Sequence, residues 1–133
     1  MRDASQKKDG SAVRFMIVDD SSFMIRELER FIRAMNCTVA ATASSGEQAV
    51  EKYPEIKPDI VTMDISMPGM NGLEALTRIL ELDPRARVVM ISGLGHENMV
   101  RECISAGAAG FLVKPLAQEQ FEQTLMPILA KFA

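Results

Sequence analysis

Short apolar runs alternate along the chain with segments in which apolar residues recur every three or four positions. Four runs span 15–18, 60–63, 88–91 and 111–113, and a fifth strand-like segment spans 37–43. Continuous apolar runs of this length are typical of strands buried on both faces of a parallel sheet. The intervening segments have the period of an amphipathic helix with one apolar stripe. The pattern therefore predicts five strand–helix pairs.

The first two predicted helices have recognisable capping residues. Ser21 or Ser22 can accept a hydrogen bond in the first turn of the first helix. Ser45 opens a capping box for the second helix, which we expect to run through Tyr53 and to end at Pro54. Each helix should therefore begin soon after a predicted strand ends.

The last three helices also have boundary signals. Asn71 suits the N-cap of a helix over 72–82, and Gly107 is placed to end the fourth helix. Pro127 lies within the apolar stripe of the fifth helix and should kink that helix or mark its loosened end. The strand–helix alternation thus continues through the whole chain.

This regular alternation determines the class of fold. We predict an α/β domain built on an open, doubly wound parallel sheet with helices on both faces, joined by right-handed crossovers. A closed eight-stranded barrel would need far more than 133 residues. In open sheets of this kind, ligands bind beyond the carboxyl ends of the strands. The search for a functional site therefore begins with the residues that follow each strand.

Composition and charge are those of a folded domain without a basic surplus. Hydrophobic residues make up 47% of the chain and charged residues 25%, both near globular averages. The net charge of −3 argues against unspecific binding to nucleic acid. No apolar run approaches the roughly 18 residues that cross a bilayer, so we expect no membrane insertion.

The start of the chain differs from the rest. We interpret 1–13, which are polar and unlike a secretory signal, as a flexible N-terminal arm, and 14–133 as the domain. Cys37 and Cys103 lie far apart and outside any metal-ligand spacing, so we expect them to be buried thiols in a reducing compartment. These features together predict a cytoplasmic protein.

Polar side chains follow four of the five predicted strands. Asp19 and Asp20 follow the first strand, Asp64 the third, Ser92 the fourth and Lys114 the fifth. Because the carboxyl ends of parallel strands meet at one edge of the sheet, we expect these side chains to lie close together.

Three carboxylates at one edge need a compensating charge, because two like charges about 4 Å apart repel by about 4 kcal/mol at an effective dielectric near 20. All-oxygen ligands favour Mg2+ as that charge. We expect Asp64 to be exposed enough to attack phosphorus and to form an acyl phosphate. Lys114 and Ser92 would then neutralise or hydrogen-bond the phosphoryl oxygens, and the mechanism does not require His96.

Each of these residues also has a plainer interpretation. The Asp19–Asp20 pair or Ser92 can simply cap the next helix, and a single lysine is usually a solvated surface charge. Their joint occurrence at one rim favours a site. Pro115 follows Lys114, and a cis bond between them, which is uncommon, would fix the lysine in place.

These motifs resemble those of the receiver domain of bacterial two-component response regulators, and most of all the single-domain, CheY-like chemotaxis type. The matching stretches are 17–20, 61–72, 89–93, 106–108 and 111–115, and the resemblance extends from about residue 14 to the end of the chain. It implies a flavodoxin-like, five-stranded parallel sheet in the order 2-1-3-4-5 with five helices.

The resemblance also assigns roles at the site. Asp64 would accept a phosphoryl group from a sensor histidine kinase in a Mg2+-dependent reaction. Asp19, Asp20, Asp64 and the backbone carbonyl of Ser66 would hold the Mg2+, directly or through water. Lys114, before a cis proline, would contact the phosphoryl group.

A conformational switch is implied in the same way. Ser92 would move toward the phosphoryl oxygens, and Phe111, where chemotaxis members often have tyrosine, would turn inward. A downstream target, either a flagellar-motor protein or another output protein, would bind the face formed by the fourth helix, the fifth strand and the fifth helix. Ser66 and Leu94 occupy positions that vary in the family and that tend to govern how readily water reaches the acyl phosphate.

The resemblance implies a signalling protein and not a turnover enzyme, with catalysis limited to its own phosphorylation and dephosphorylation. We expect a monomer that could dimerise on activation. A stand-alone protein is favoured because the chain ends where the last helix should end; the alternative is a fragment of a regulator with a DNA-binding or enzymatic output domain. A Mg2+-dependent phosphohydrolase is less favoured, because such enzymes usually need an acid–base carboxylate where this chain has Ser66.

Overall fold

The computed structural model describes residues 6–93 and 95–132. The elements are β1 (Arg14–Val18), α1 (Ser22–Ala34), β2 (Thr38–Ala43), α2 (Gly46–Ile56), β3 (Ile60–Asp64), α3 (Gly72–Leu82), β4 (Val88–Ser92), α4 (Glu97–Ala106), β5 (Gly110–Val113), α5 (Gln118–Leu129) and a 3-10 turn (Ala130–Phe132). Within these residues, five parallel strands form one sheet in the order β2-β1-β3-β4-β5. The predicted fold class and strand order are confirmed.

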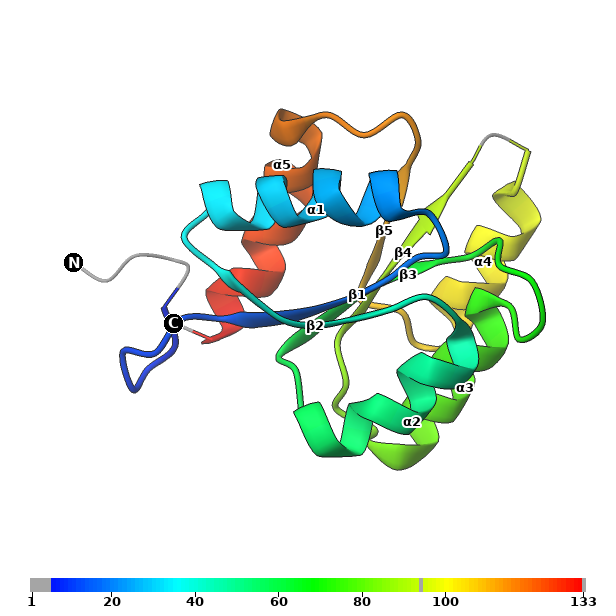
Figure 1. Ribbon diagram of the computed structural model, residues 1–133, viewed down its shortest axis with the longest axis horizontal. Helices are drawn as coiled ribbons and strands as arrows, with labels where there is room; N and C mark the ends of the chain where they lie inside the picture. The colour runs from blue at the N-terminus through cyan, green and yellow to red at the C-terminus, as the bar shows by residue number, and fades with distance from the viewer. Residues whose placement is uncertain (1–5, 94, 133) are drawn as a thin grey trace.

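Two layers of helices cover the sheet (Figure 1). α1 and α5 lie against one face, and α2, α3 and α4 lie against the other. The buried side chains beneath α1 and α5 are mainly aromatic and branched aliphatic. Beneath α2, α3 and α4 the core also includes four buried methionines, Met16, Met63, Met67 and Met90. The sheet therefore separates two half-cores of different composition.

The strands differ in how completely they are buried. Every residue of β3 and β4 is buried, as expected for the interior of a parallel sheet. The same expectation is wrong for β5, where Leu112 is buried but Phe111 is 45% exposed and Val113 is 40% exposed. β5 forms the edge of the sheet, and α4 does not cover these two side chains.

The N-caps of α1 and α3 are confirmed. Ser21 Oγ accepts a hydrogen bond from the Met24 N–H at 3.3 Å, and Asn71 Oδ1 accepts one from the Glu74 N–H at 2.9 Å. Both capping residues have extended backbones, as N-cap residues do. α1 and α3 therefore begin where their capping residues predict.

α2 begins at the predicted place but ends later. Ser45 Oγ accepts a hydrogen bond from the Gln48 N–H at 3.1 Å, as predicted. The predicted end at Pro54 is wrong, because α2 includes that proline and continues to Ile56. The helix ends when Lys57 adopts a left-handed conformation and its N–H donates to the Tyr53 carbonyl.

The last two helices end through different devices. Gly107, with a φ of 115°, ends α4 as predicted. α5 continues through Pro127 to Leu129, and the chain then tightens into the 3-10 turn.

The start of the described chain is attached to the amino end of the sheet. Gln6 and Ala12 form an antiparallel bridge around a turn, and Lys7 Nζ lies 3.2 Å from Asp59 Oδ2. Val13 is fully buried in the core beneath α1 and α5. Residues 1–5 of the predicted arm lie outside the described residues.

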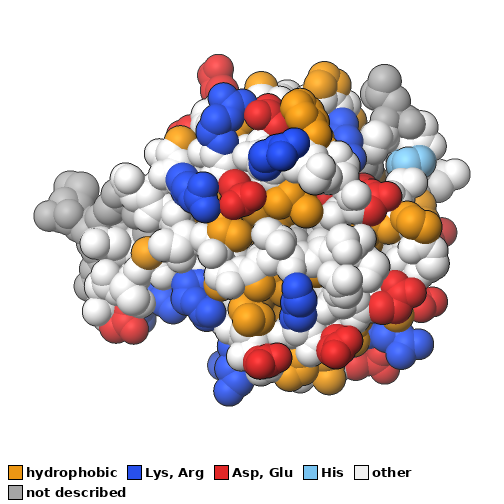
Figure 2. All heavy atoms as spheres, viewed as in Figure 1, with side chains coloured by type: hydrophobic (Ala, Val, Ile, Leu, Met, Phe, Trp, Pro, Cys, Tyr) orange, Lys and Arg blue, Asp and Glu red, His pale blue; other side chains and the backbone are white. Residues whose placement is uncertain are grey.

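Charged side chains of both signs are interspersed on the face shown in Figure 2. Both cysteines, Cys37 and Cys103, are buried as predicted. Within residues 6–93 and 95–132, every helix is shorter or more polar than a membrane-spanning helix.

Candidate functional site

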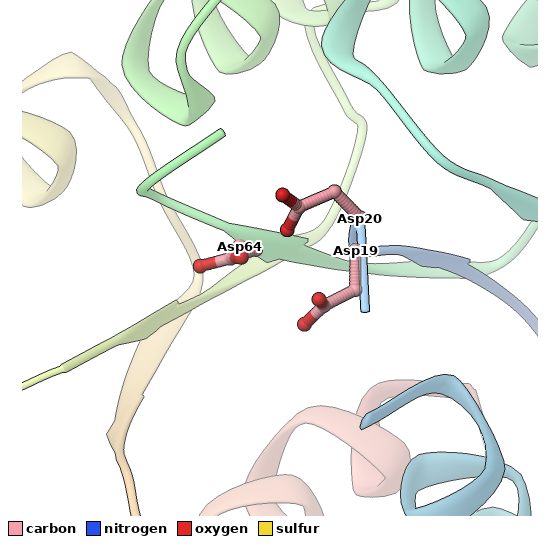
Figure 3. A group of neighbouring side chains, drawn as sticks. All are labelled: Asp19, Asp20 and Asp64. Atoms are coloured by element: carbon pink, nitrogen blue, oxygen red, sulfur yellow. The ribbon is translucent and has the colours of Figure 1, made fainter. Parts of the chain in front are cut away.

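The three predicted carboxylates lie together at the carboxyl end of the sheet (Figure 3). Asp19 and Asp20 follow β1, and Asp64 is the last residue of β3. β1 and β3 are neighbours with Val18 opposite Met63, so the next residue of each strand falls side by side. Each carboxylate offers one oxygen, and these three oxygens all lie within 4.8 Å of one another.

The three carboxylates differ in exposure. Asp19 is fully buried and Asp64 is 3% exposed, whereas Asp20 is exposed. Asp64, which the sequence predicts to be exposed enough to attack phosphorus, is more buried than its position before a loop suggests. Asp64 is paired in register with Ile91 of β4, so it lies within the sheet instead of in the loop beyond it. The exposed Asp20 marks the solvent side of the cluster.

Lys114 supplies a positive charge at the same rim. Its Nζ lies 3.9 Å from Asp19 Oδ2 and 3.8 Å from Asp64 Oδ1. Lys114 follows β5, and its backbone N–H donates to the Ser92 carbonyl at 2.8 Å. The Lys114–Pro115 peptide bond is cis. The ammonium therefore lies between two buried carboxylates, at long ion-pair distances from both.

Burial and crowding raise the pKa of two carboxyl groups. The pKa of Asp64 is raised to about 6 by burial and by the Asp19 charge, while Lys114 and the Ser66 N–H oppose the rise. Burial likewise raises the pKa of Asp19, while the Ser21 N–H and Lys114 oppose it. A carboxyl with a raised pKa is one whose charged form lacks sufficient stabilisation.

The acidic cluster fits a hard divalent cation. Asp19 Oδ2 is buried and accepts no hydrogen bond from the described residues, although the Lys114 ammonium lies 3.9 Å away. A buried carboxylate oxygen without a hydrogen-bond donor is costly. One carboxylate oxygen of Asp19 lies within 4.8 Å of one oxygen each from Asp20 and Asp64. An all-oxygen set of this kind matches the ligand preference of Mg2+. A bound cation would therefore satisfy an oxygen that the described residues leave without a hydrogen-bond donor.

Of three further predicted residues, Ser66 contacts the cluster, and Ser92 and Phe111 line a groove. The Ser66 N–H donates to Asp64 Oδ1 at 3.2 Å, and the Ser66 side chain is exposed. Ser92 is 2% exposed at the end of β4 and lines a groove of about 620 Å3 with Phe111 of β5 and residues of α4. Phe111 points partly into solvent in this groove. Leu94, the second position linked to water access, lies outside the described residues.

Two residues beside the site were not assigned a site role from the sequence. The Ser21 N–H donates to Asp19 Oδ1 at 2.9 Å. Ser21 therefore hydrogen-bonds the carboxylate through its backbone and caps α1 through its side chain. Gly72 lies against the end of β3, where an added Cβ would come within 2.4 Å of the Asp64 carbonyl oxygen. A glycine inside the matched stretch 61–72 was the available signal for this close approach.

Comparison with known proteins gives consistent matches over most of the chain. The model of the response regulator receiver domain matches residues 15–126. The chemotaxis protein CheY of Thermotoga maritima is 46% identical over 112 residues, which cover 84% of this chain and 93% of that protein. CheY of Bacillus subtilis is 45% identical over 109 residues, covering 82% and 91%. The crystal structure of the CheX–CheY–BeF3–Mg2+ complex from Borrelia burgdorferi is similar with a TM-score of 0.89 and 39% identity, covering 96% of this chain and 98% of that one.

Proposed function

The chain belongs to the response regulator receiver family and is a CheY-like signalling domain, and on that premise we propose that Asp64 is its phosphoacceptor. The observation that carries this assignment is the acidic cluster with Lys114 beside it. Asp64 is the member of the cluster that lies at the end of the central strand β3, within 3.8 Å of the lysine. Its partner Asp19 has an oxygen with no hydrogen-bond donor among the described residues.

Asp19, Asp20, Asp64 and the backbone carbonyl of Ser66 would hold Mg2+. The cation, when bound, would neutralise charge on the phosphoryl oxygens. The structural support is the crowding of carboxylate oxygens and the raised pKa of Asp64. The Borrelia burgdorferi relative forms its complex with BeF3 and Mg2+, which supports the same choice of ion here.

The transfer step uses the ionised Asp64 carboxylate as nucleophile. One carboxylate oxygen forms a bond to phosphorus while the bond from phosphorus to the imidazole nitrogen of a histidine kinase breaks, and that nitrogen keeps the electron pair. Lys114 holds a positive charge next to the phosphoryl oxygens throughout. Because the carboxylate attacks without losing a proton, no general base is needed. Hydrolysis of the acyl phosphate by water would restore Asp64.

Ser92 and Phe111 would transmit the phosphorylated state to a partner. Ser92 ends β4 beside the cluster, and Phe111 lies partly exposed in the same groove. Movement of Ser92 toward the phosphoryl group would open space for Phe111 to turn inward. The α4–β5–α5 face would then change shape, which is a two-state element biased by a local charge.

The partners follow from this assignment. A sensor histidine kinase would supply the phosphoryl group, and a protein of the flagellar motor or another output protein would bind the α4–β5–α5 face. CheX is the partner in the Borrelia burgdorferi complex, so a CheX-type protein is a further candidate. We propose that the protein acts in the cytoplasm, as a monomer that could dimerise on activation.

A phosphohydrolase is not favoured. Ser66 stands two residues after Asp64, where such an enzyme would need an acid–base carboxylate, and the described structure places no other carboxylate within the cluster besides Asp19 and Asp20. The catalysis we propose is therefore limited to the protein's own phosphorylation and dephosphorylation.

Intact-protein mass spectrometry tests the assignment. The protein is incubated with a small-molecule phosphodonor such as acetyl phosphate, with Mg2+ or with EDTA. We expect one Mg2+-dependent phosphoryl addition in the unmodified chain and in Asp59→Asn, which changes a carboxylate at the other end of β3. Asp64→Asn should take up none. An equal addition to Asp64→Asn, or an addition that EDTA does not reduce, would overturn the assignment.

A further inference from the structure

The loop between β3 and α3, residues 65–71, has one side at the acidic cluster. The Ser66 N–H donates to Asp64 Oδ1 at 3.2 Å. The two ends of the loop are joined by a hydrogen bond of 2.9 Å from the Gly72 N–H to the Ile65 carbonyl. Ile65 and Met67 are buried in the core beneath α2, α3 and α4. The position of Ser66 therefore depends on how the whole loop is held.

The other side of this loop contacts the first turn of α2. A Cβ added at Gly46 would lie 2.8 Å from the Met70 carbonyl oxygen, so the two backbones approach closely. Glu47 Oε2 accepts a long hydrogen bond of 3.4 Å from the Met70 N–H. A Cβ added at Gly69 would lie 2.9 Å from the same Glu47 oxygen. The Glu47 carboxylate thus lies directly over the Gly69–Met70 peptide.

We propose that Glu47 is a positioning residue for the magnesium site, which it serves by holding the β3–α3 loop so that Ser66 stays against Asp64. This inference rests on the proposed function, because it concerns an ion that Asp64 and the Ser66 carbonyl would help to hold. Glu47 touches neither the cluster nor a phosphoryl group; it acts through the loop. Its place in the first turn of α2 also suits a negative charge, because the helix dipole is positive there.

A purely structural role for Glu47 would have different consequences. In that case, loss of the carboxylate would weaken α2 without changing the loop or the affinity for Mg2+. Glu51, one turn later on the same helix and also exposed, is the matched control. Glu51→Ala removes the same charge from the same helix but no contact with the loop. The two variants therefore separate positioning from helix stability and from surface charge.

Amide hydrogen exchange measured by NMR in the metal-free protein tests the contact itself. Glu47→Ala should increase the exchange rate of the Met70 amide by about threefold, a modest effect because the hydrogen bond is long and solvent-exposed. Glu47→Gln keeps an acceptor oxygen and should stay near the unmodified protein, as should Glu51→Ala. A Met70 amide that exchanges equally fast in all four proteins overturns the proposal.

Mg2+ titration by calorimetry tests the consequence. We expect Glu47→Ala to weaken the affinity by about threefold, in proportion to the loosened loop, and Glu47→Gln and Glu51→Ala to leave it within error. Equal weakening in Glu47→Ala and Glu51→Ala would indicate a charge effect and would contradict positioning. If the unmodified chain does not bind Mg2+, the proposed function fails together with this inference. If it binds and Glu47→Ala binds equally well, only the inference fails.

A double-mutant cycle with Gly69→Ala gives an independent measurement. Gly69 has a φ of 76°, so alanine is strained there in any background, and its Cβ also meets the Glu47 carboxylate. In the Glu47→Ala background, the contact between the new Cβ and the Glu47 carboxylate is absent, and only the backbone strain is left. We therefore expect Gly69→Ala to weaken Mg2+ binding less in that background than in the unmodified chain. Strictly additive effects would overturn the contact on which the proposal depends.

Discussion

β3 has a carboxylate at each end, and the two have opposite surroundings. Asp59, which precedes the strand, accepts the Arg14 N–H at 2.8 Å and lies 3.2 Å from the Lys7 ammonium. Asp64, which ends the strand, is crowded by two further carboxylates, and Lys114 stays 3.8 Å away. The fold satisfies the first carboxylate and leaves the second short of compensating charge. The neighbouring groups, and not the residue type, therefore give Asp59 its hydrogen-bond donors and raise the pKa of Asp64.

The largest effect we expect from this contrast is a pH dependence of stability in the metal-free protein. Asp64 has a pKa of about 6 when folded, above its ordinary value of 3.8. Between these values the folded chain holds a proton that the unfolded chain has released. The free energy of unfolding should therefore fall as the pH rises through this window, by about 3 kcal/mol in all.

Urea denaturation in EDTA between pH 4 and 7 measures this dependence. Asp64→Asn cannot ionise at this position. The free energy of unfolding of the unmodified chain should therefore fall, relative to that of the variant, as the pH rises toward 7. Saturating Mg2+ should reduce the difference, because the cation favours the ionised form. Parallel stability curves for the two proteins would show that folding does not raise the pKa of Asp64.

The second effect concerns the affinity for Mg2+. Asp19→Asn removes a charge from the buried side of the cluster, where Oδ2 has no donor among the described residues. We expect the affinity to fall by about tenfold to a hundredfold. Asp59→Asn, at the other end of β3, should leave it within a factor of about two. Calorimetric titration of both variants checks this, and similar losses in the two would contradict a localised site.

The sequence predicted the acidic cluster because its members are defined by topology alone. Each residue that follows a strand in a parallel sheet reaches the same edge, so Asp19, Asp64 and Lys114 could be grouped without coordinates. The burial of Asp64 could not be predicted in the same way. It depends on β3 extending one residue beyond its apolar run, so that Asp64 pairs with Ile91 inside the sheet.

The errors in the fold have local causes. The end of α2 was misplaced because Pro54 loses only its own hydrogen bond within a helix that its neighbours continue. The exposure of Phe111 and Val113 was missed because burial at an edge strand depends on which helix packs over it. The contact between Glu47 and Met70 joins residues that are 23 positions apart, and no sequence motif predicts it.

The third effect belongs to the satisfied carboxylate. Asp59→Ala leaves the Arg14 N–H without its acceptor and removes the ion pair with Lys7. We expect the free energy of unfolding to fall by about 1 to 2 kcal/mol, with Mg2+ affinity and phosphorylation of Asp64 unchanged. Denaturation and phosphorylation are measured on the same preparation. A loss of phosphorylation without a loss of stability would reverse the roles that we assign to the two ends of β3.

The smallest effect also lies at the amino end of the sheet. Tyr53 donates a hydrogen bond to Asp83 Oδ2 at 2.8 Å, and burial, together with that carboxylate, raises the pKa of the phenol above its ordinary value. Tyr53→Phe should therefore cost about 1 kcal/mol of stability at neutral pH without altering Mg2+ binding.

Because the chain has one tyrosine and no tryptophan, absorbance during an alkaline titration reports on this group alone. Ionisation near the ordinary value of 10 in the folded protein would show that the bond to Asp83 does not persist in solution. An elevated pKa with unchanged Mg2+ binding in Tyr53→Phe would show that a buried, perturbed group at this end of the sheet serves the fold, and that perturbation alone does not identify a reactive site.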